Sequence, residues 1–284
     1  MSEPPAPRLE NRLPAEDLGG PEEHPLRELA WLLLATLSVL LVLTLLLAWG
    51  SRWLAPRVPF SVEQALADKM MPAPAQPTPR QAALQALADR VAEQMALPPG
   101  MTLVVSDDPS PLVNAYATVG GRIRVFEGLL ARVESEEALA ALLAHEIAHV
   151  KHRHVAANLG RGLAVALVLG MVSTDAGAAA QGLLGDAAGL ALLGYSREQE
   201  AEADAEALRA VVALHGHAGG LLALFETLGR QEGAGAGGVE LLRTHPLTSS
   251  RLQAIEAEAT ARGHALRGAL HPLPEALRVA PRKP

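Results

Sequence analysis

The segment His145-Glu146-Ile147-Ala148-His149 constrains this chain more than any other stretch, because it reads H-E-x-x-H inside a continuous helical pattern. Residues four apart lie on the same face of a helix, so the two imidazoles are about one turn from each other. That spacing lets two histidines bind one Zn²⁺, and the glutamate between them can activate the attacking water. The segment therefore predicts a zinc hydrolase, and a peptidase in particular.

The residues around the motif predict that its helix is buried. Ser135 is a suitable N-cap, and the two acids that follow it suit the helix dipole. From Ala138 to Val150 the chain has no Gly or Pro, and outside the motif it contains only Ala, Leu, Ile and Val. Two histidines and a glutamate on a buried helix are costly unless a metal or hydrogen bonds satisfy them. The alternative is a structural helix whose core histidines are hydrogen-bonded.

A second segment, Ser196 to Asp204, reads as the start of another helix with a serine N-cap. Here the sequence resembles the membrane-associated zinc metallopeptidases that include HtpX, the OMA-type proteases, BepA and the CAAX prenyl endopeptidases. Their second motif is E-x-x-x-D, which Glu200 and Asp204 match. The resemblance implies that Glu200 is the third zinc ligand and that Asp204 orients a zinc-binding histidine.

Two further segments extend the resemblance, which covers roughly Pro59 to Leu252. The stretch 244–251 looks like the family's late H-P…R motif. This implies that His245 either stabilises an oxyanion or occupies the open metal position, and that Arg251 pairs with an acid. On its own, His245 would be read as a helix-entry residue.

Upstream of the motif helix, two strands flank a Gly-Gly turn at 120–121. The family carries a similar Asn-Ala-aromatic-Ala edge strand, which holds extended substrate by backbone pairing. An ordinary hairpin packed on the core is the alternative, and one strand can serve both purposes. The resemblance implies substrate binding by Asn114, Ala115, Tyr116 and Ala117.

The remaining charged residues near the motifs receive no site role. His152 lies about two turns from His145, roughly 10 Å along the axis, so it cannot share an ion with both motif histidines. Residues 151–154 are interpreted as a basic helix end that complements the dipole. Glu198 and Glu202 fall out of register with E-x-x-x-D and are interpreted as solvated helix charges. No partner suggests itself for His215, His217, His264 and His271.

Residues 29–48 run for twenty positions without a charge, which as a helix spans about 30 Å, the hydrocarbon thickness of a bilayer. Trp31, Trp49 and Trp53 near its ends suit the membrane interface. The basic residues on the two sides are nearly equal in number, so they do not decide the orientation. Analogy with compact bacterial relatives favours an inner-membrane anchor and a periplasmic catalytic domain. The absence of cysteine excludes structural disulfides.

Composition divides the chain into five parts: a disordered acidic tail (1–28), a transmembrane helix (29–50), a juxtamembrane segment with a Pro-rich linker (51–80), a zinc metallopeptidase domain (81–262) and a C-terminal tail (263–284). Helices are expected at 59–66 and 81–97, and a strand at 102–105. The apolar region 163–193 is a helical hairpin that packs on the core or inserts in the membrane. The glycine-rich stretch 233–238 is either a gate over the site or a tolerated loop.

These observations predict an α+β, mostly helical, zincin-like metallopeptidase domain with a small β-sheet, preceded by one transmembrane helix. One Zn²⁺ per chain would be held by His145, His149 and Glu200, with Glu146 as the catalytic base and His245 as its catalytic partner. The expected substrates are extended or unfolded protein segments, in envelope protein quality control, and the expected partners include the lipid bilayer but no nucleic acid. The alternatives are a tethered chaperone or binding module whose zinc site is structural or latent, and a purely structural helix without zinc.

Overall fold

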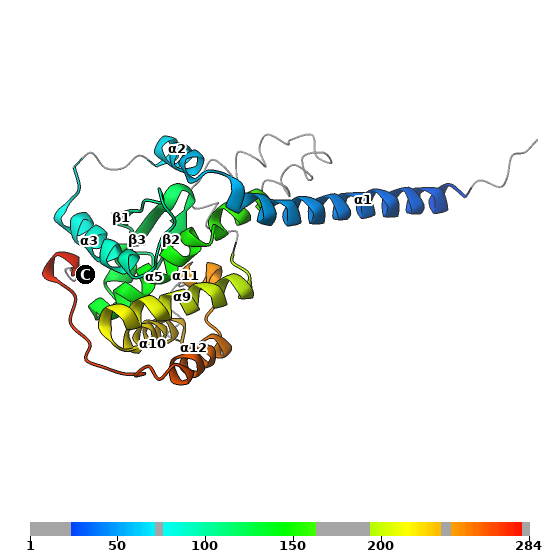
Figure 1. Ribbon diagram of the computed structural model, residues 1–284. Coiled ribbons are helices and arrows are strands. Elements are labelled where there is room, and N and C mark those ends of the chain that lie inside the picture. The colour runs from blue at the N-terminus through cyan, green and yellow to red at the C-terminus, as the bar shows by residue number, and fades with distance from the viewer. Residues whose placement is uncertain (1–23, 72–75, 163–193, 234–239, 280–284) are drawn as a thin grey trace, which may run out of the picture. The chain divides into compact units, whose positions relative to one another are not determined.

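The computed structural model describes residues 24–71, 76–162, 194–233 and 240–279 (Figure 1). The chain forms two units, residues 1–43 and 44–284. Most of the acidic tail, the apolar region 163–193 and most of the glycine-rich stretch 233–238 lie outside the described residues, so those expectations stay predictions. Helix α1 contains a stretch, Pro25–Leu47, that is long and apolar enough to cross a membrane. It agrees with the helix predicted at 29–50.

The described elements follow one another as α1 (Pro25–Leu54), η2 (Ala55–Arg57), α2 (Phe60–Met70), α3 (Pro79–Glu93), β1 (Val104–Asp108), β2 (Ala115–Thr118), η3 (Val119–Gly121), β3 (Arg122–Phe126), α4 (Glu127–Leu130), α5 (Glu136–Lys151), α9 (Arg197–His215), α10 (Gly219–Gly233), α11 (Glu240–Thr244), α12 (Ser249–Ala261) and η4 (Glu275–Leu277). This mostly helical chain with a small sheet confirms the predicted fold class.

The sheet has three described strands in the order β1-β3-β2. Strand β3 runs parallel to β1, with Val104 opposite Arg122, and antiparallel to β2, with Ala117 opposite Ile123. Strand β2 is therefore an edge strand, as the sequence predicts. All four of its residues are buried, because α5 packs against it.

Helix α5 forms the centre of the second unit. Every residue from Glu137 to Val150 is buried, and α3, α9, α10 and β2 all pack against this helix. Ser135 caps its N-terminus by accepting a hydrogen bond from the backbone N–H of Ala138 at 3.2 Å. The cap, the two acids of the first turn and the apolar residues around the motif together give the buried helix that the sequence predicts.

The turn between β2 and β3 requires glycine. Gly120 and Gly121 both have left-handed backbone angles, with φ of 69° and 74°. A Cβ at Gly120 would lie 2.7 Å from the Cβ of Ala67 in α2, and one at Gly121 would lie 2.1 Å from the carbonyl oxygen of Thr102. The two glycines thus let α2 and the chain before β1 pack closely on the sheet.

The chain after α12 packs on the same core. Leu273 and Leu277 are buried, at 4% and 1% exposed. Residues Ser135 and Pro272 form an isolated β-bridge, and the N–H of Glu136 donates to the carbonyl of His271 at 2.9 Å. The stretch 263–279, which composition assigns to a tail, therefore covers the N-terminal end of α5 as a strap. Its two buried leucines make apolar contacts with the core, which the proline-rich sequence did not lead us to predict.

Candidate metal centre

Helix α5 supplies the H-E-x-x-H side chains from its buried interior. His145 and His149 lie on one face, and their Nε2 atoms are 3.1 Å apart. Their rings meet edge to face, with centroids 4.8 Å apart. His145 is 6% exposed and His149 is fully buried. The four-residue spacing thus aims both nitrogens at one point, as it predicts.

Helix α9 brings a carboxylate to the same point. Ser196 caps this helix in a reciprocal capping box with Gln199, which confirms the predicted N-cap. One turn into the helix, Glu200 Oε1 lies 3.4 Å from His149 Nε2, and its Oε2 lies 3.6 Å from His145 Nε2. Glu200 is 2% exposed. The close packing of α9 on α5 therefore places the predicted third ligand beside the two histidines.

His245 follows directly after α11 and completes the cluster. Its Nδ1 lies 3.2 Å from His145 Nε2 and 2.9 Å from Glu200 Oε1. One donor atom from each of His145, His149, Glu200 and His245 can be chosen so that all four lie within 4.8 Å of one another. The late H-P…R segment thus reaches the centre that the other two motifs form.

The residues present fit a divalent metal ion. Three imidazoles and one carboxylate form a nitrogen and oxygen donor set that suits zinc. Beside the cluster, Glu146 Oε1 and His245 Nε2 are buried without a hydrogen-bond partner. In the cluster itself, Glu200 Oε2 lacks a well-directed hydrogen bond, although the guanidinium of Arg251 lies 2.6 Å away. A bound cation would explain why this buried oxygen of Glu200 is left unpaired.

The electrostatics of the centre favour metal-binding forms. Burial holds the pKa of His149 well below its ordinary value, so this imidazole is neutral. For Glu200, burial raises the pKa, but hydrogen bonds with His149 and His245 outweigh it and keep the carboxylate ionised. A neutral imidazole and an ionised carboxylate are the forms that bind metal.

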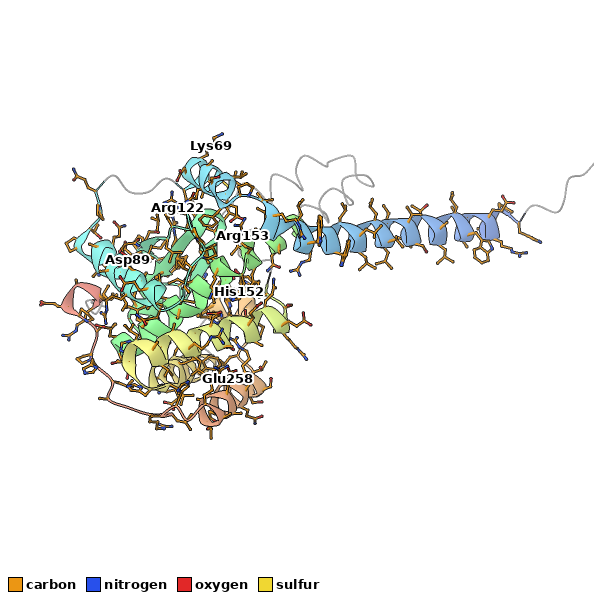
Figure 2. The ribbon with its side chains drawn as sticks, viewed as in Figure 1. Lys69, Asp89, Arg122, His152, Arg153 and Glu258 are labelled. Atoms are coloured by element: carbon orange, nitrogen blue, oxygen red, sulfur yellow. The ribbon has the colours of Figure 1, made fainter. Side chains whose placement is uncertain are left out.

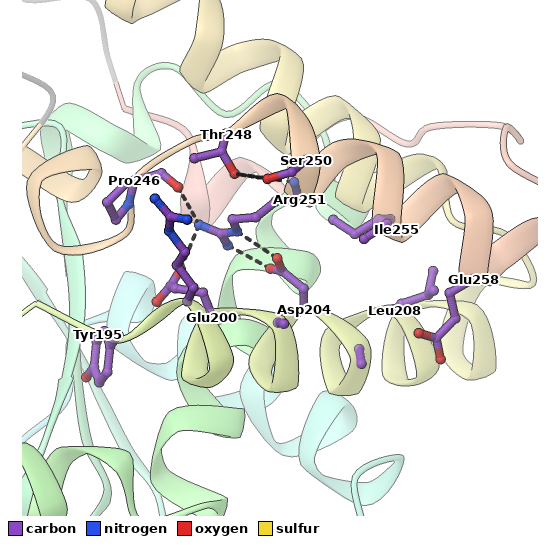
Figure 3. A pocket seen from close by; sticks show the side chains of 14 residues that line it. Tyr195, Glu200, Asp204, Leu208, Pro246, Thr248, Ser250, Arg251, Ile255 and Glu258 are labelled. Atoms are coloured by element: carbon purple, nitrogen blue, oxygen red, sulfur yellow. Dashed lines mark hydrogen bonds and ion pairs between the residues drawn. The ribbon is translucent and has the colours of Figure 1, made fainter.

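Behind the cluster, Asp204 and Arg251 hold His145. Asp204 Oδ1 lies 3.1 Å from His145 Nδ1, on the side of the ring opposite the metal centre. Arg251 donates two hydrogen bonds to Asp204, from Nε and Nη2, both at 2.7 Å (Figure 3). Arg251 also donates to the carbonyl of Pro246, which links α12 to the His245 segment. The acid partner implied for Arg251 is thus Asp204, with Glu200 close by.

Glu146 is fully buried between the centre and the sheet. Its Oε2 accepts a hydrogen bond from the backbone N–H of Ala117 at 2.8 Å, and its Oε1 lies 3.7 Å from His245 Nε2. On the same edge of β2, the carbonyl of Val113 accepts from the N–H of Leu241 at 3.2 Å. The edge expected to hold substrate is therefore engaged at two positions by the protein itself.

Two hollows adjoin the centre. A cavity of ≈ 20 Å³ touches His145, Glu146 and His245, and has room for about one water molecule. A larger groove of ≈ 380 Å³ lies between α9 and α12 (Figure 3). Glu200 and Arg251 line it, but Glu146 and the three histidines do not, so it lies behind the carboxylate ligand. Of these two hollows, Glu146 lines only the smaller one.

The structure corrects two sequence interpretations. His154 does not end a helix; α5 ends at Lys151, and His154 begins a further helical run, 154–162. Its Nδ1 lies 3.0 Å from His149 Nδ1, and its Nε2 lies 3.0 Å from Glu202 Oε2. Glu202 is half-exposed but paired, to both His154 and His152, rather than simply solvated. Helical spacing gives no signal for these contacts, because the helix breaks between the residues that meet.

Tyr195 is a further contact that the sequence did not indicate. Its ring stacks on His149 with centroids 3.7 Å apart and planes inclined by 24°. It lies just before the Ser196 cap, so the start of α9 fixes it beside the centre. Tyr116, a predicted substrate-binding residue, packs against Phe126, with ring centroids 5.8 Å apart.

Fold and centre together define a class of protein: a metallopeptidase built on a buried H-E-x-x-H helix, with a carboxylate contributed by a second helix. The family model described as Peptidase family M48 matches residues 78–259. The chain belongs to peptidase family M48. The metal centre described above fits this peptidase family.

Curated relatives agree with this assignment. The mitochondrial metalloendopeptidase OMA1 of Schizosaccharomyces pombe is 35% identical over 54% of this chain and 45% of its own length. The metalloprotease YcaL of Escherichia coli is 31% identical over 50% of this chain and 57% of its own. The beta-barrel assembly-enhancing protease of Escherichia coli is 30% identical over 49% of this chain and 31% of its own. The chain thus matches between about a third and just over half of these relatives' length.

Proposed function

We propose that this protein is a membrane-anchored, zinc-dependent endopeptidase that cleaves extended or unfolded protein segments. The observation that carries the proposal is the convergence of His145, His149 and Glu200 on one buried point, with Glu146 directly beside it. Zinc bound there would act as a Lewis acid toward water and the scissile carbonyl. The three side chains would hold it, with one ion per chain.

Glu146 is suited to act as the general base and then the general acid. Its Oε1 is buried without a hydrogen-bond partner and borders the cavity that has room for about one water. There it would take a proton from the attacking water and deliver that proton to the leaving amine. His245 Nε2, which is also unpaired, lies 3.7 Å away and would stabilise the developing oxyanion.

The substrate would bind as a strand along β2. The backbone groups of Val113, Ala115 and Ala117 face away from β3, because Asn114 and the alternate residues after it form the pairs with that strand. An extended peptide could add to this edge beside Glu146. In the described state Glu146 and Leu241 already occupy part of the edge, so binding would require both to release it.

One observation supports a second candidate function. His245 Nδ1 lies within the donor cluster itself, so this histidine could fill the fourth metal position. The protein would then be a tethered chaperone or binding module with a latent zinc site. Under this alternative, Glu146→Gln leaves the biological effect intact, whereas Glu200→Ala removes it.

The first prediction tests the mechanism by Glu146→Gln. The full chain and the variant, both purified in detergent, are compared for zinc content and for casein cleavage. We expect one zinc per chain in both, and a loss of cleavage of at least about 100-fold in the variant, because the base is removed while the ligands remain. An active Glu146→Gln protein would refute the mechanism, and a folded wild type without zinc would refute the metal centre.

A wild type that binds zinc without cleaving casein would instead favour the latent site. In a wild type that does cleave casein, His245→Ala distinguishes the two roles of this histidine. If His245 fills the fourth position, its removal should raise cleavage. If it stabilises the oxyanion, its removal should lower cleavage by about 10²-fold or more.

The proposed setting is a single-pass anchor in the bacterial inner membrane, with the catalytic domain in the periplasm and a role in envelope protein quality control. Support comes from the apolar stretch Pro25–Leu47 and from relatives named as proteases, one of them as beta-barrel assembly-enhancing.

A further inference from the structure

The two α5 histidines of the metal centre differ in what holds their outer nitrogens. Nδ1 of His145 meets the carboxylate of Asp204 at 3.1 Å, which is a common arrangement for a metal-binding histidine. Nδ1 of His149 instead meets Nδ1 of His154 at 3.0 Å, and His154 Nε2 in turn meets Glu202 Oε2 at 3.0 Å. A carboxylate therefore stands behind each histidine, directly in one case and through a second imidazole in the other.

We propose that His154 is a positioning residue of the metal centre: anchored by Glu202, it holds His149 in the tautomer that presents Nε2 to the metal. The proposal rests on the proposed zinc-dependent function. It assigns a role to His154 and Glu202, neither of which is a defining residue of the three motifs.

The direction of the hydrogen bonds follows from the groups involved. An ionised carboxylate only accepts, so His154 Nε2 must donate to Glu202. A neutral imidazole has one donor and one acceptor, so His154 Nδ1 is left as the acceptor. The hydrogen between the two Nδ1 atoms must then belong to His149, which leaves the lone pair of His149 on Nε2. That atom is the one that faces His145 and Glu200.

The contact between His149 and His154 requires an unfavourable backbone conformation at Arg153. Arg153 adopts a left-handed conformation, with φ of 60°, which is unfavourable for a residue other than glycine. It ends the course of α5 and lets the next helical run begin at His154. The Arg153 side chain is held by an ion pair with Glu63 at 2.7 Å and a hydrogen bond to the carbonyl of Val58 at 2.8 Å. The reversal is therefore fixed from outside, and His154 is buried, at 6% exposed.

A neighbouring histidine, His152, also contacts Glu202, but it pairs away from the metal ligands. His152 Nδ1 lies 3.0 Å from Glu202 Oε1, so it shares the carboxylate with His154. Its ring stacks on that of His154, with centroids 5.5 Å apart, but its Nε2 lies 3.4 Å from Glu206 Oε1, away from the metal ligands. His152 and Arg153 are both labelled in Figure 2. His152 is thus a matched control for removing an imidazole beside Glu202.

The test measures zinc affinity, by competition with a chelator, on the full chain purified in detergent. His154→Leu removes the acceptor at similar volume, and we expect its zinc dissociation constant to rise 10- to 100-fold. His154→Asn places an amide oxygen near the former Nδ1 and should recover most of the affinity. His152→Leu should bind zinc as the wild type does. Glu202→Ala, at a half-exposed helix position, should weaken binding in the same direction as His154→Leu.

Two further readouts separate positioning from packing. The melting temperatures of the zinc-free proteins report folding, and the visible spectra of the Co²⁺-substituted proteins report ligand geometry. We expect the Co²⁺ spectrum to change in His154→Leu and to return toward the wild-type form in His154→Asn. If His154→Leu does not fold, Glu202→Ala and His154→Asn still carry the test.

The proposal is overturned if His154→Leu or Glu202→Ala binds zinc with wild-type affinity, or if His152→Leu loses as much affinity as His154→Leu. It is also overturned if the affinities follow the zinc-free melting temperatures and His154→Asn gives no recovery. A wild type that binds no zinc would refute the proposed function as well, so the two failures are distinguishable.

Discussion

At the scale of single residues, the metal centre has an unusual balance of buried charge. The carboxylates of Glu146, Glu200 and Asp204 are each at most 3% exposed, and Arg251 is the guanidinium that contacts two of them. Buried carboxylates are costly unless they are paired. Arg251 compensates for part of this charge, and a divalent cation at the donor cluster would compensate for the rest. The metal and Arg251 are therefore both parts of one electrostatic unit.

This balance predicts that removing Arg251 destabilises the fold itself. In Arg251→Met, Asp204 and Glu200 lose the ion pairs at 2.7 and 2.6 Å. Leaving buried charges uncompensated typically costs about 3–5 kcal/mol. We expect the free energy of unfolding of the zinc-free chain to fall by about 3 kcal/mol, measured by urea denaturation in detergent.

Arg262→Met is the matched control, because Arg262 follows the same helix and its ion pair with Glu258 is on the surface, with side chains 51% and 33% exposed. Its loss should cost less than about 1 kcal/mol. If the two substitutions lower the free energy of unfolding equally, the buried ion pairs of Arg251 contribute no more to stability than the surface pair does.

At the scale of elements, the sequence predicts those parts of the site that lie at helical spacing or directly after a helix N-cap. The spacing of His145 and His149 and the caps Ser135 and Ser196 are local signals, and the structure bears out the helices that they predict. The third and fourth donors, Glu200 and His245, could be named only through a family resemblance. No physical rule in the sequence brings residues 45 positions apart to a hydrogen-bond distance.

The two features that the sequence could not predict, the His154 contact and the strap, both involve an interrupted helical pattern. His154 reaches back to His149 because Arg153 turns left-handed, and nothing in the residue type announces that turn. The same holds for the strap, residues 263–279, whose four leucines are spaced four, three and four residues apart, as on a helix, although Pro272 and Pro274 lie among them and the structure forms only the short η4 there. Both features depend on tertiary contacts, with Glu63 in the first case and with α5 in the second.

The strap predicts a dependence of stability on pH. His271 donates to the buried Glu137 from its backbone N–H at 2.8 Å and lies with its Nδ1 at 2.6 Å from the same carboxylate. The Glu137 hydrogen bond raises the pKa of His271 above its ordinary 6.5. Burial raises the pKa of Glu137, but its bonds with His271 outweigh this and lower it below its ordinary 4.5. His215 and Glu136 also face this pair.

The directions of these two pKa shifts define the pH range in which the pair stabilises the fold. The histidine contribution is complete below about pH 6.5 and is lost as the pH rises through its raised folded value. The glutamate contribution is present above about pH 4.5 and is lost as the pH falls through its lowered value. We expect the wild-type melting temperature to fall more steeply between about pH 6 and 9 than that of His271→Gln, which keeps the backbone bond. Parallel curves would contradict this role of the strap.

At the scale of the whole molecule, the proposed periplasmic orientation can be tested cleanly, because the chain has no cysteine of its own. Ala86 and Ala88 lie two residues apart in α3, the first exposed and the second fully buried. In intact cells expressing the full chain, a membrane-impermeant maleimide should label Ala86→Cys. Ala88→Cys should be labelled only after denaturation.

Labelling of Ala86→Cys only after the cells are lysed would place the catalytic domain in the cytoplasm and contradict the proposed orientation. The Ala88→Cys protein controls for unfolding, because it differs only in the burial of the introduced thiol. Both substitutions are small and lie outside the metal centre.

The closed edge of β2 also acts as a filter on which chains can be cut. If only a fraction of molecules releases the edge at any moment, the apparent dissociation constant of every peptide is multiplied by the inverse of that fraction. An open fraction of about 1% weakens all ligands about 100-fold, and a short peptide with few backbone pairs has little affinity to spare. A long unstructured segment can form many backbone pairs at once. Its affinity is reduced by the same factor, but it starts from a higher affinity. Discrimination would then follow the length of unfolded chain more than its sequence.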